Sequence, residues 1–320
     1  MKKNQSIIKE VVEEMGGTIE KIIPERKYFC ININKEKIFV SRKFEIASDL
    51  ISGKMLTAYK DLTYVVLKKN NISTPNSACF YRKTITSDDI EKKLKSLSYP
   101  IVLKDSNGSN SEGVFVNIKS ASEAKKIILR EINNFKFLIA QEMIFGKEYR
   151  VLILGNEAIG VLEMIPPRIS GDGKNTIRKL IRKKQLKNFE KTNLDLILNN
   201  ILKDQKVNLD TILKKGKKIF IKGISCLAEG GETMDATELI HPEIKKICIQ
   251  AARATGRNLA GIDLICEDIA IHPSKQTVSI IEVNGKPDIY IHYNPTKGKT
   301  QNVVKKIIHY ILKIKTVSDL

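Results

Sequence analysis

The fold is decided by residues 279–287, which read SIIEVNGKP. The β-branched start predicts a buried strand, and the glycine and proline that follow predict a turn where the strand ends. Side chains alternate along a strand, so we expect Glu282 and Asn284 to share a face while Ile281 and Val283 enter the core. A carboxylate and an amide oxygen two residues apart are hard ligands that suit Mg²⁺. Alone, the stretch also fits a strand that simply becomes polar at the surface.

A second apolar strand supports the metal site. Residues 260–266, which read AGIDLIC, place the single carboxylate of Asp263 in the middle of a run that should be buried. A buried carboxylate is costly unless it is paired or bound to a metal. If the two strands are neighbours, Asp263, Glu282 and Asn284 converge. We therefore favour a cation site over a strand end that is merely polar.

Length and composition fit a soluble globular protein. The 320 residues are 42% hydrophobic and 28% charged, which is enough for a sizeable core and two or three subdomains. No apolar run is long enough to cross a membrane, and the N-terminus lacks an apolar signal core, so we expect a cytoplasmic protein with no membrane partner. No CxxC spacing occurs, and we expect reduced, mostly buried thiols. The five cysteines are Cys30, Cys79, Cys226, Cys248 and Cys266.

The chain is strongly basic, with a formal net charge of +19 and a pI near 9.5. Such a charge attracts anions. Because the lysines are spread along the sequence and not gathered in one tract, we interpret them as solvated helix faces. Tryptophan is absent and no aromatic-rich basic patch is visible, so the platforms on which bases stack are missing. We do not expect a nucleic-acid partner.

The patterns divide the chain into three units, with expected boundaries at 1–84, 85–145 and 146–320. Alternating strands and helices predict an α+β fold, or an α/β-type fold with mixed sheets. We expect one helix that ends at Gly16 and another that begins after the N-cap Ser87. Further helices are expected over 52–71, 121–133, 175–188, 192–203, 242–256 and 300–315. We expect a hairpin over 28–41 turning near Asn34-Lys35, strands over 100–104, 114–118, 137–142, 149–154, 158–165 and 218–222, and loops over 105–113, 166–173 and 228–232.

Two lysines occupy informative places in this pattern. Lys60 lies in the first turns of the helix over 52–71, which carries Leu62, Val65, Val66 and Leu67 as one expected apolar stripe. Lys104 ends a buried strand directly before the glycine-containing loop over 105–113. Such a loop can present backbone N–H groups to a phosphate, although a plain hairpin loop is the default interpretation.

In order and type, these features resemble the ATP-grasp superfamily of carboxylate–amine ligases, and within it the cyanophycin synthetases and the ligase half of bifunctional glutathione synthetases. The resemblance covers residues 50–312 and implies an ATP-grasp fold with a small N-terminal unit, a central lid subdomain and a larger C-terminal subdomain with the metal site. The motifs that carry it are GKEYRVL at 146–152, GDGKNTIRKLI at 171–181, GG at 230–231 with MDAT at 234–237 and HP at 241–242, GID at 261–263, IEVN at 281–284, and His292 with Pro295 and Gly298.

The resemblance implies that the chain binds ATP together with two Mg²⁺ ions, with Mn²⁺ as an alternative. Asp263, Glu282 and Asn284 would hold the metal, which bridges the phosphates and neutralises developing charge. Lys60 and Lys104 would contact phosphates as point charges. Without the resemblance, Lys60 would be interpreted as an exposed helix lysine. The expected nucleotide contacts are Lys60, Lys104, Ser109, Ser111 and Gly113 at the phosphates, Gln141, Glu142 and Ile144 at the adenine, and Glu148 at the ribose hydroxyls.

The implied reaction has two steps. A substrate carboxylate attacks the γ-phosphate of ATP to give an acylphosphate and ADP, and an amine then displaces phosphate to form an amide. Catalysis would consist mostly of positioning and charge stabilisation. Arg150, Arg168 and Lys222 are the expected catalytic residues, which hold the carboxylate or stabilise the acylphosphate. The alternative for the two arginines is a surface ion pair.

Departures from the family pattern gather around the acceptor substrate, so the nucleotide and metal assignments are more secure than any substrate. A lysine at position 222 replaces an arginine and lacks its bidentate fork. The other departures are Asp105, Ser111, Gln141, Cys226, Glu229 and Asp288.

Three hypotheses remain open. The main one is a ligase that joins an amino acid or peptide carboxylate to an amine, acting alone or as one member of a pathway. The second is glutathione-type synthesis from a γ-glutamyl dipeptide. The third, from another class, is a basic binding protein on a fold that has lost turnover. The expected partners are small-molecule or peptide substrates and, by analogy with the relatives, a second copy in a homodimer.

Overall fold

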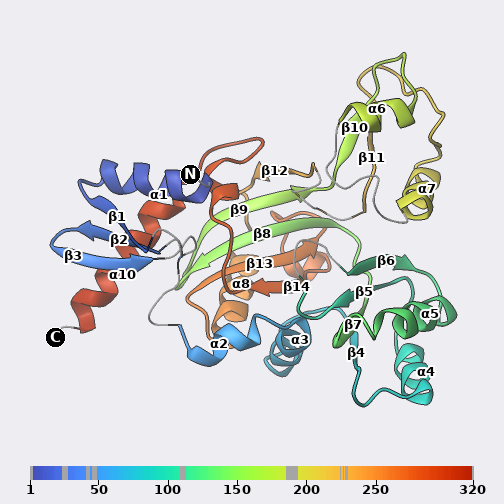
Figure 1. Cartoon of the computed structure of the whole chain (residues 1–320), viewed down its shortest axis with the longest axis horizontal. Coiled ribbons are helices and arrows are strands. Elements are labelled where there is room, and N and C mark those ends of the chain that lie inside the picture. The colour runs from blue at the N-terminus through green and yellow to red at the C-terminus, as the bar shows by residue number, and fades with distance from the viewer. Residues whose placement is uncertain are drawn as a thin grey trace.

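The computed structural model describes residues 3–23, 28–40, 44, 49–108, 113–184, 194–223, 225, 227 and 230–318. Three β-sheets follow one another along the long axis of the molecule, each covered by helices, and a small lobe stands out beside the third sheet (Figure 1). Every pair of named strands in the described chain is antiparallel. The α+β class is confirmed, whereas the mixed strand directions are not found.

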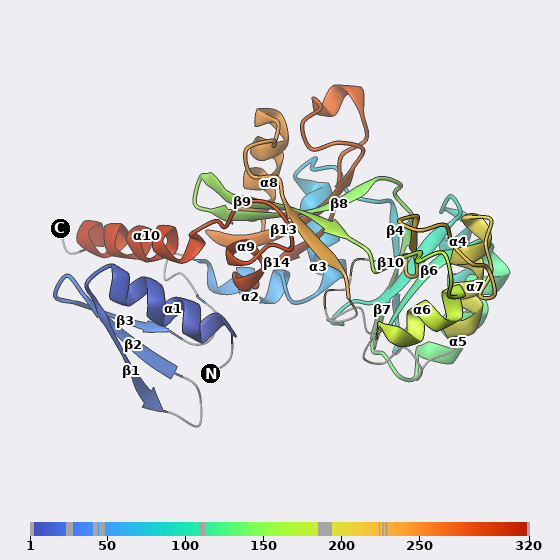
Figure 2. The ribbon, with the colours of Figure 1, turned by 90° about the horizontal axis from the view of Figure 1, so that it is seen from above.

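The first sheet has the order β1-β2-β3 and lies at the end of the molecule away from the lobe (Figure 2). The predicted hairpin is confirmed, because Asn34 and Lys35 adopt positive φ angles of 51° and 65° between β2 and β3. Helix α1 packs on α10 from the other end of the chain, and both contribute to one apolar core. The elements are α1 (Lys3–Glu14), β1 (Thr18–Ile23), β2 (Tyr28–Ile33), β3 (Glu36–Val40) and α10 (Val303–Ser318).

The central sheet has the order β12-β9-β8-β13-β14 and carries the two strands from which the sequence argument began. The inner strands are mostly apolar, with Glu148, Arg150 and Asp263 among the charged exceptions. Helix α8 covers one face of the sheet with four buried residues, which are Ile244, Cys248, Ala251 and Ala252. The elements are β8 (Lys147–Leu154), β9 (Glu157–Ile165), β12 (Glu232–Asp235), α8 (Pro242–Ala254), β13 (Leu259–Cys266), the 3₁₀ turn η3 (Pro273–Lys275), β14 (Ser279–Asn284) and α9 (Tyr290–Tyr293).

The third sheet has the order β4-β7-β5-β6 and is backed by two helices that share its core. Its first strand lies before the expected boundary at residue 84 but pairs with β7. Thr86, one residue before the predicted Ser87, caps α4 by accepting a hydrogen bond from the backbone N–H of Asp89. The elements are β4 (Ser77–Tyr81), α4 (Ser87–Lys95), β5 (Ile101–Asp105), β6 (Val114–Ile118), α5 (Ala121–Glu131) and β7 (Phe137–Glu142).

The helix predicted over 52–71 is two helices, α2 (Ile51–Leu56) and α3 (Lys60–Lys69). The chain turns extended at Tyr59, which caps α3, so that Lys60 opens the second helix. The predicted apolar stripe is also wrong, since Leu62 and Val65 are exposed and Val66 is only half-buried. Asp61, Thr63, Tyr64 and Leu67 are buried instead. The helix is rotated because the carboxylate of Asp61 has buried hydrogen-bond partners on the third sheet.

The lobe comprises residues 167–222 and has a small apolar core of its own, which includes Ile177, Leu202 and Ile219. The loop predicted over 166–173 contains a strand that pairs with the residues after 217. The elements are β10 (Arg168–Ser170), α6 (Ile177–Lys183), α7 (Leu194–Asp204) and β11 (Lys218–Phe220).

Two further findings concern the described residues as a whole. No helix there has the length and apolar character needed to cross a membrane. Cys30, Cys248 and Cys266 are buried free thiols, and Cys79 is a half-buried one. Cys226 lies outside the described residues.

Candidate active site

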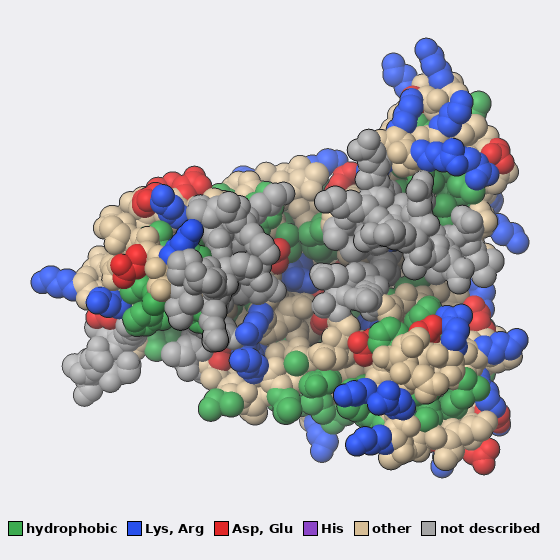
Figure 3. Space-filling model, in the orientation of Figure 1, with side chains coloured by type: hydrophobic (Ala, Val, Ile, Leu, Met, Phe, Trp, Pro, Cys, Tyr) green, Lys and Arg blue, Asp and Glu red, His purple; other side chains and the backbone are tan. Residues whose placement is uncertain are grey.

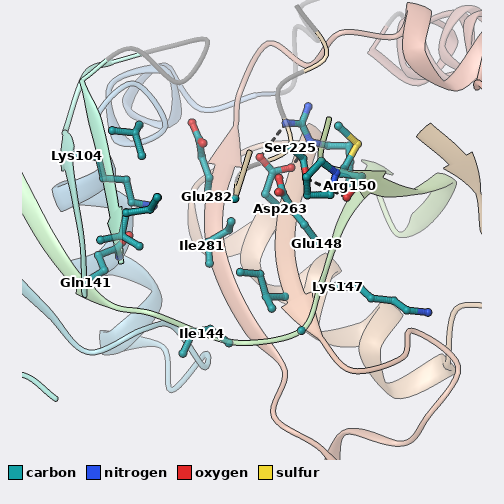
Figure 4. A pocket seen from close by; sticks show the side chains of 18 of the residues that line it. Lys104, Gln141, Ile144, Lys147, Glu148, Arg150, Ser225, Asp263, Ile281 and Glu282 are labelled. Carbon is teal, nitrogen blue, oxygen red and sulfur yellow. Dashed lines mark hydrogen bonds and ion pairs between the residues drawn. The ribbon is translucent and has the colours of Figure 1, made fainter. Parts of the chain in front are cut away.

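A large cavity of about 900 Å³ lies between the central sheet and the third sheet. The segment that joins β7 to β8 forms its floor in the view of Figure 4, with Lys104 and Gln141 on one wall and Glu282, Asp263, Glu148 and Arg150 on the other. The cavity thus brings together residues that are far apart in the sequence. The further lining residues include Lys60, Gly108, Val116, Met164, Pro166, Phe220, Gly223, Ser225, Asn284 and Asp288.

Strand β14 presents its polar side chains to the cavity through a bulge. Asp263 pairs with Glu282, but Leu264 pairs with Ile280, so Ile281 is the extra residue. Ile280 and Val283 are buried in the core, whereas Ile281 lines the cavity beside Glu282. The prediction that Glu282 and Asn284 share a face holds in that both line the cavity, and the prediction that Ile281 enters the core is wrong.

Asp263 is the centre of a buried polar cluster on this wall. Its carboxylate accepts two hydrogen bonds from the guanidinium of Arg150, one from Nε and one of 2.8 Å from Nη2. The side-chain amide of Asn284 donates a third, of 3.0 Å. Burial by itself would lower the pKa of Arg150, but the neighbouring Asp263 raises it, so the guanidinium remains charged.

Glu148 lies on the same wall, on strand β8. Burial and then the negative charge of Asp263 raise the pKa of Glu148 to about 7, against a smaller opposing effect of Ser225. The carboxyl group can therefore gain or lose a proton near neutral pH. The side chain of Lys147, the preceding residue, points away from the opposite wall and forms an ion pair of 3.7 Å with Glu163.

Lys104 on β5 faces these carboxylates from the third sheet (Figure 4). Among the described residues, its ammonium has no hydrogen-bond or ion-pair partner. Burial lowers its pKa, while the charge of Glu282 across the cavity opposes that effect. A half-buried ammonium that faces carboxylates across a cavity and has no direct partner is well placed to bind an anion that is not part of this chain.

Lys60 connects the two walls. Its ammonium donates a hydrogen bond of 2.6 Å to the carbonyl oxygen of Gly108, in the loop that follows β5, and lies 3.6 Å from a carboxylate oxygen of Glu282. Its backbone N–H donates to the carbonyl oxygen of Ser106 at 2.9 Å. Lys60 is therefore not the exposed helix lysine of the alternative interpretation.

Asp61 contacts the start of the same loop, and the sequence did not predict this role. Its carboxylate accepts a hydrogen bond from the hydroxyl of Ser106 and another, of 3.2 Å, from Tyr81. Its backbone N–H donates to the Ser106 hydroxyl at 3.2 Å. No local sequence signal identifies this role, because the partner residues are 20 and 45 positions away.

The residues predicted to contact the adenine lie on β7 and the segment after it, and they also line the cavity. Gln141 donates to the Ser77 hydroxyl at 3.0 Å, and its buried amide oxygen has no partner among the described residues. Ile144 lies on the cavity floor (Figure 4). The carboxylate of Glu142 accepts hydrogen bonds from Ser98 and Asn76 instead. Residue 146 has to be glycine for the backbone of the cavity floor to pack against Cys266. A Cβ there would lie only 2.6 Å from the carbonyl oxygen of Cys266.

Other predicted residues lie outside this wall or outside the described chain. Arg168 forms an ion pair of 2.5 Å with Glu232 at the base of the lobe, as the surface-pair alternative supposed, and does not line the cavity. Lys222 is half-buried at the same base and does not line it either. Gly113 is described, with φ of 67°, and lies against the ring of Phe135. Ser109 and Ser111 lie outside the described residues.

Comparisons with known proteins agree with this geometry. A family model described as an ATP-grasp domain matches residues 57–288, which is more than two thirds of the chain. A glutathione biosynthesis bifunctional protein of Clostridium perfringens is 27% identical over 283 residues, which cover 85% of this chain and 36% of that protein. A cyanophycin synthetase of Geminocystis herdmanii is 28% identical over 270 residues, which cover 81% of this chain and 30% of that protein. The chain thus spans about a third of the length of these relatives.

One solved structure matches nearly the whole chain. It is a bifunctional glutathione synthetase from Pasteurella multocida, with a TM-score of 0.67, 21% sequence identity, and coverage of 97% of this chain and 44% of that chain. At this identity the likeness establishes the fold. Substrates have to be argued from the residues of this chain.

Proposed function

This chain belongs to the ATP-grasp family, and on that premise we propose that it is an ATP- and Mg²⁺-dependent carboxylate–amine ligase that forms an amide or peptide bond through an acylphosphate. The activity would be ADP-forming. The acceptor and donor are amino acids or short peptides.

The observation that carries the proposal is the opposition of charges across the cavity. Lys104 is a half-buried cation without a hydrogen-bond or ion-pair partner in the described chain, and Asp263 and Glu282 face it from the other wall. A phosphate chain with a bound metal satisfies both walls at once, because its oxygens meet the lysine and its metal meets the carboxylates.

The donor set fits magnesium. Asp263, Glu282 and Asn284 supply two carboxylates and an amide from paired strands, and Mg²⁺ commonly uses one or two carboxylates together with substrate phosphates and water. When bound, the metal neutralises charge that develops on the phosphates.

The chain's own residues would position the reacting groups. Lys104 would bind the phosphates, while Lys60 keeps the Gly108 loop at their edge. Arg150 is held by Asp263 on the carboxylate wall, where it can orient the attacking carboxylate and then the acylphosphate. Gln141 would accept from the adenine amino group through its unpartnered amide oxygen.

Phosphate release from Mg-ATP, measured against pairs of amino acids and short peptides, tests the proposal. We expect release that requires a carboxylate and an amine together, with an amide product identified by mass spectrometry. The Glu282→Gln variant is the control and should lose release, because a neutral amide binds magnesium weakly.

Intact Mg-ATP binding with no amide product from any pair would contradict the ligase. A steeply salt-dependent affinity for nucleic acid in that case would favour the binding-protein hypothesis. Release confined to a γ-glutamyl dipeptide with one amine would identify glutathione-type synthesis.

A further inference from the structure

The excess positive charge of the chain is concentrated in the lobe. Residues 167–222 contain 16 Lys and Arg against five Asp and Glu, an excess of 11, whereas the net charge of all 320 residues is +19. More than half of the net charge therefore lies on 56 residues. The lysines are therefore less evenly spread than the sequence analysis supposed, and Figure 3 shows Lys and Arg side chains on the surface of the lobe.

Most of these cations face solvent without a partner. Ten of them are exposed and make no side-chain hydrogen bond or ion pair with any residue that the structure describes. Two of the lobe's acids are already engaged, since Asp172 accepts hydrogen bonds from its own loop and Asp210 pairs with Arg178. The ten are Lys174, Lys179, Arg182, Lys183, Lys203, Lys206, Lys214, Lys215, Lys217 and Lys218.

The lobe opens onto the cavity. Pro166 and Gly223, which flank it in the sequence, both line the cavity, and so does Phe220 on strand β11. An imaginary Cβ on Gly223 would lie 3.9 Å from Val116 on the third sheet, so the base of the lobe borders that sheet too. A ligand bound along the lobe therefore ends beside Lys104 and the carboxylate wall.

The described part of the lobe is poorly suited to nucleic acid, because it offers few aromatic side chains on which bases could stack. Thirteen of the lobe's 16 cations are lysines, which are flexible point charges that attract carboxylates and phosphates alike. Phe220 is the one exposed aromatic side chain among the lobe residues that the structure describes, too few for base stacking.

We propose that the lobe binds an acidic peptide, rich in Asp or Glu, and delivers one of its carboxylates to the cavity for activation. The proposal rests on the proposed ligase function and deepens it, because it names the class of carboxylate substrate. Charge complementarity supplies capture and orientation of the peptide, and the cavity supplies the chemistry.

A matched pair of charge variants tests this. The lobe variant carries Lys214→Gln, Lys215→Gln, Lys217→Gln and Lys218→Gln, at four exposed positions around β11. The control variant carries Lys83→Gln, Lys92→Gln, Lys95→Gln and Lys126→Gln, which remove the same charge from exposed positions around the third sheet. Fluorescence anisotropy measures binding of labelled oligo-aspartate, oligo-asparagine and oligo-thymidylate to the full chain, at low and at physiological salt.

We expect the unchanged protein to bind oligo-aspartate and not oligo-asparagine. The lobe variant should bind oligo-aspartate about tenfold more weakly, as four exposed charge contacts of modest strength combine. The control variant should change by less than about twofold, because its lysines lie outside the proposed contact surface. Equal losses in the two variants would overturn the proposal in favour of general attraction, and tighter binding of oligo-thymidylate that the lobe variant loses would overturn it in favour of nucleic acid.

A second readout separates this proposal from the ligase. Mg-ATP affinity and phosphate release with a free amino acid as the carboxylate should be the same in the lobe variant and the unchanged protein. If turnover is absent in all three proteins but only the lobe variant loses oligo-aspartate binding, the ligase proposal is wrong and the lobe proposal is supported. If turnover is present and the lobe variant binds oligo-aspartate as tightly as the unchanged protein, the ligase proposal is supported and the lobe proposal is wrong.

Discussion

The two walls of the cavity handle charge in opposite ways. On the central sheet, Asp263 has Arg150 and Asn284 as partners, so its charge is neutralised within the protein. On the third sheet, Lys104 is half-buried and has no hydrogen-bond or ion-pair partner in the described chain. Asp263 therefore has partners within the protein, whereas Lys104 gains one only when an anion binds.

The difference teaches how to separate stability from function at this site. A charge with protein partners stabilises the fold, so its removal should lower the free energy of unfolding. A buried charge without partners is retained at a cost in stability, which points to a role in binding. The following variants test this contrast, from the largest expected effect to the smallest.

Asp263→Asn should cause the largest loss of stability. It leaves the buried guanidinium of Arg150 without its anion, and such a change typically costs about 3–5 kcal/mol in the free energy of unfolding. Urea unfolding followed by circular dichroism measures it. Glu282→Gln is the comparison, because Glu282 is a third exposed and lies 3.6 Å from Lys60, and it should cost under about 1 kcal/mol. Equal costs would mean that the buried pair is not special.

Lys104→Met, on the opposite wall, should raise the stability of the protein and weaken the binding of Mg-ATP. Burial lowers the pKa of Lys104, so the folded state binds its proton less tightly than the unfolded chain and loses stability below the unfolded pKa. Replacement by an apolar side chain of similar length should therefore raise the free energy of unfolding at pH 7. Mg-ATP affinity should fall about 10- to 100-fold with the loss of a charged hydrogen bond.

Calorimetric titration with Mg-ATP, beside urea unfolding, checks both effects of that change. The exposed Lys95→Met is the matched control and should alter neither quantity. A Lys104→Met protein that is less stable than the unchanged chain would refute the contrast between the walls.

Asp61→Asn should weaken the support of the lysine wall. The amide cannot accept from both Ser106 and Tyr81 as the carboxylate does, which should cost about 1–2 kcal/mol in stability. Since Ser106 orders the loop that Lys60 contacts, the KM for ATP should rise several-fold while kcat changes little. Steady-state kinetics measure this, and an unchanged KM would show that the loop is ordered without the Asp61 clamp.

His292→Leu should have the smallest effect and only below neutral pH. His292 is buried against Gly160, neither ring nitrogen has a partner in the described chain, and burial lowers its pKa to about 3. The unfolded chain takes up the proton near pH 6.5, so stability is lost as the pH falls below that value, by about 1.4 kcal/mol at pH 5.5. Urea unfolding at pH 7 and pH 5.5 should show that the leucine variant lacks this loss. An equal loss in both proteins would assign the pH dependence to other groups.

The sequence predicted the carboxylate wall better than the lysine wall because of where the relevant contacts lie. Strand alternation and two short motifs brought together Asp263, Glu282 and Asn284, which depend on neighbouring strands of one sheet. A one-residue bulge, which alternation does not reveal, turned Ile281 toward the cavity. The role of Asp61 depends on a residue 45 positions away, and periodicity carries no information about such a contact.

The same reasoning explains the two larger errors. The apolar residues of 52–71 fit one long helix, but a buried carboxylate rotated the second half of it. The lobe's excess charge is already present in the consecutive residues 167–222, but only the packing of α6, α7, β10 and β11 shows that this stretch forms one separate unit.

Lys60 lies between the Gly108 carbonyl oxygen and Glu282, and so it serves as an internal counter-ion for that carboxylate. A metal ion that binds Glu282 has to compete with this ammonium, whereas a phosphate chain offers the ammonium another partner. Nucleotide should therefore tighten metal binding, and by thermodynamic reciprocity metal should tighten nucleotide binding by the same factor. The two ligands would then enter as one unit, and the order in which they are added would not matter.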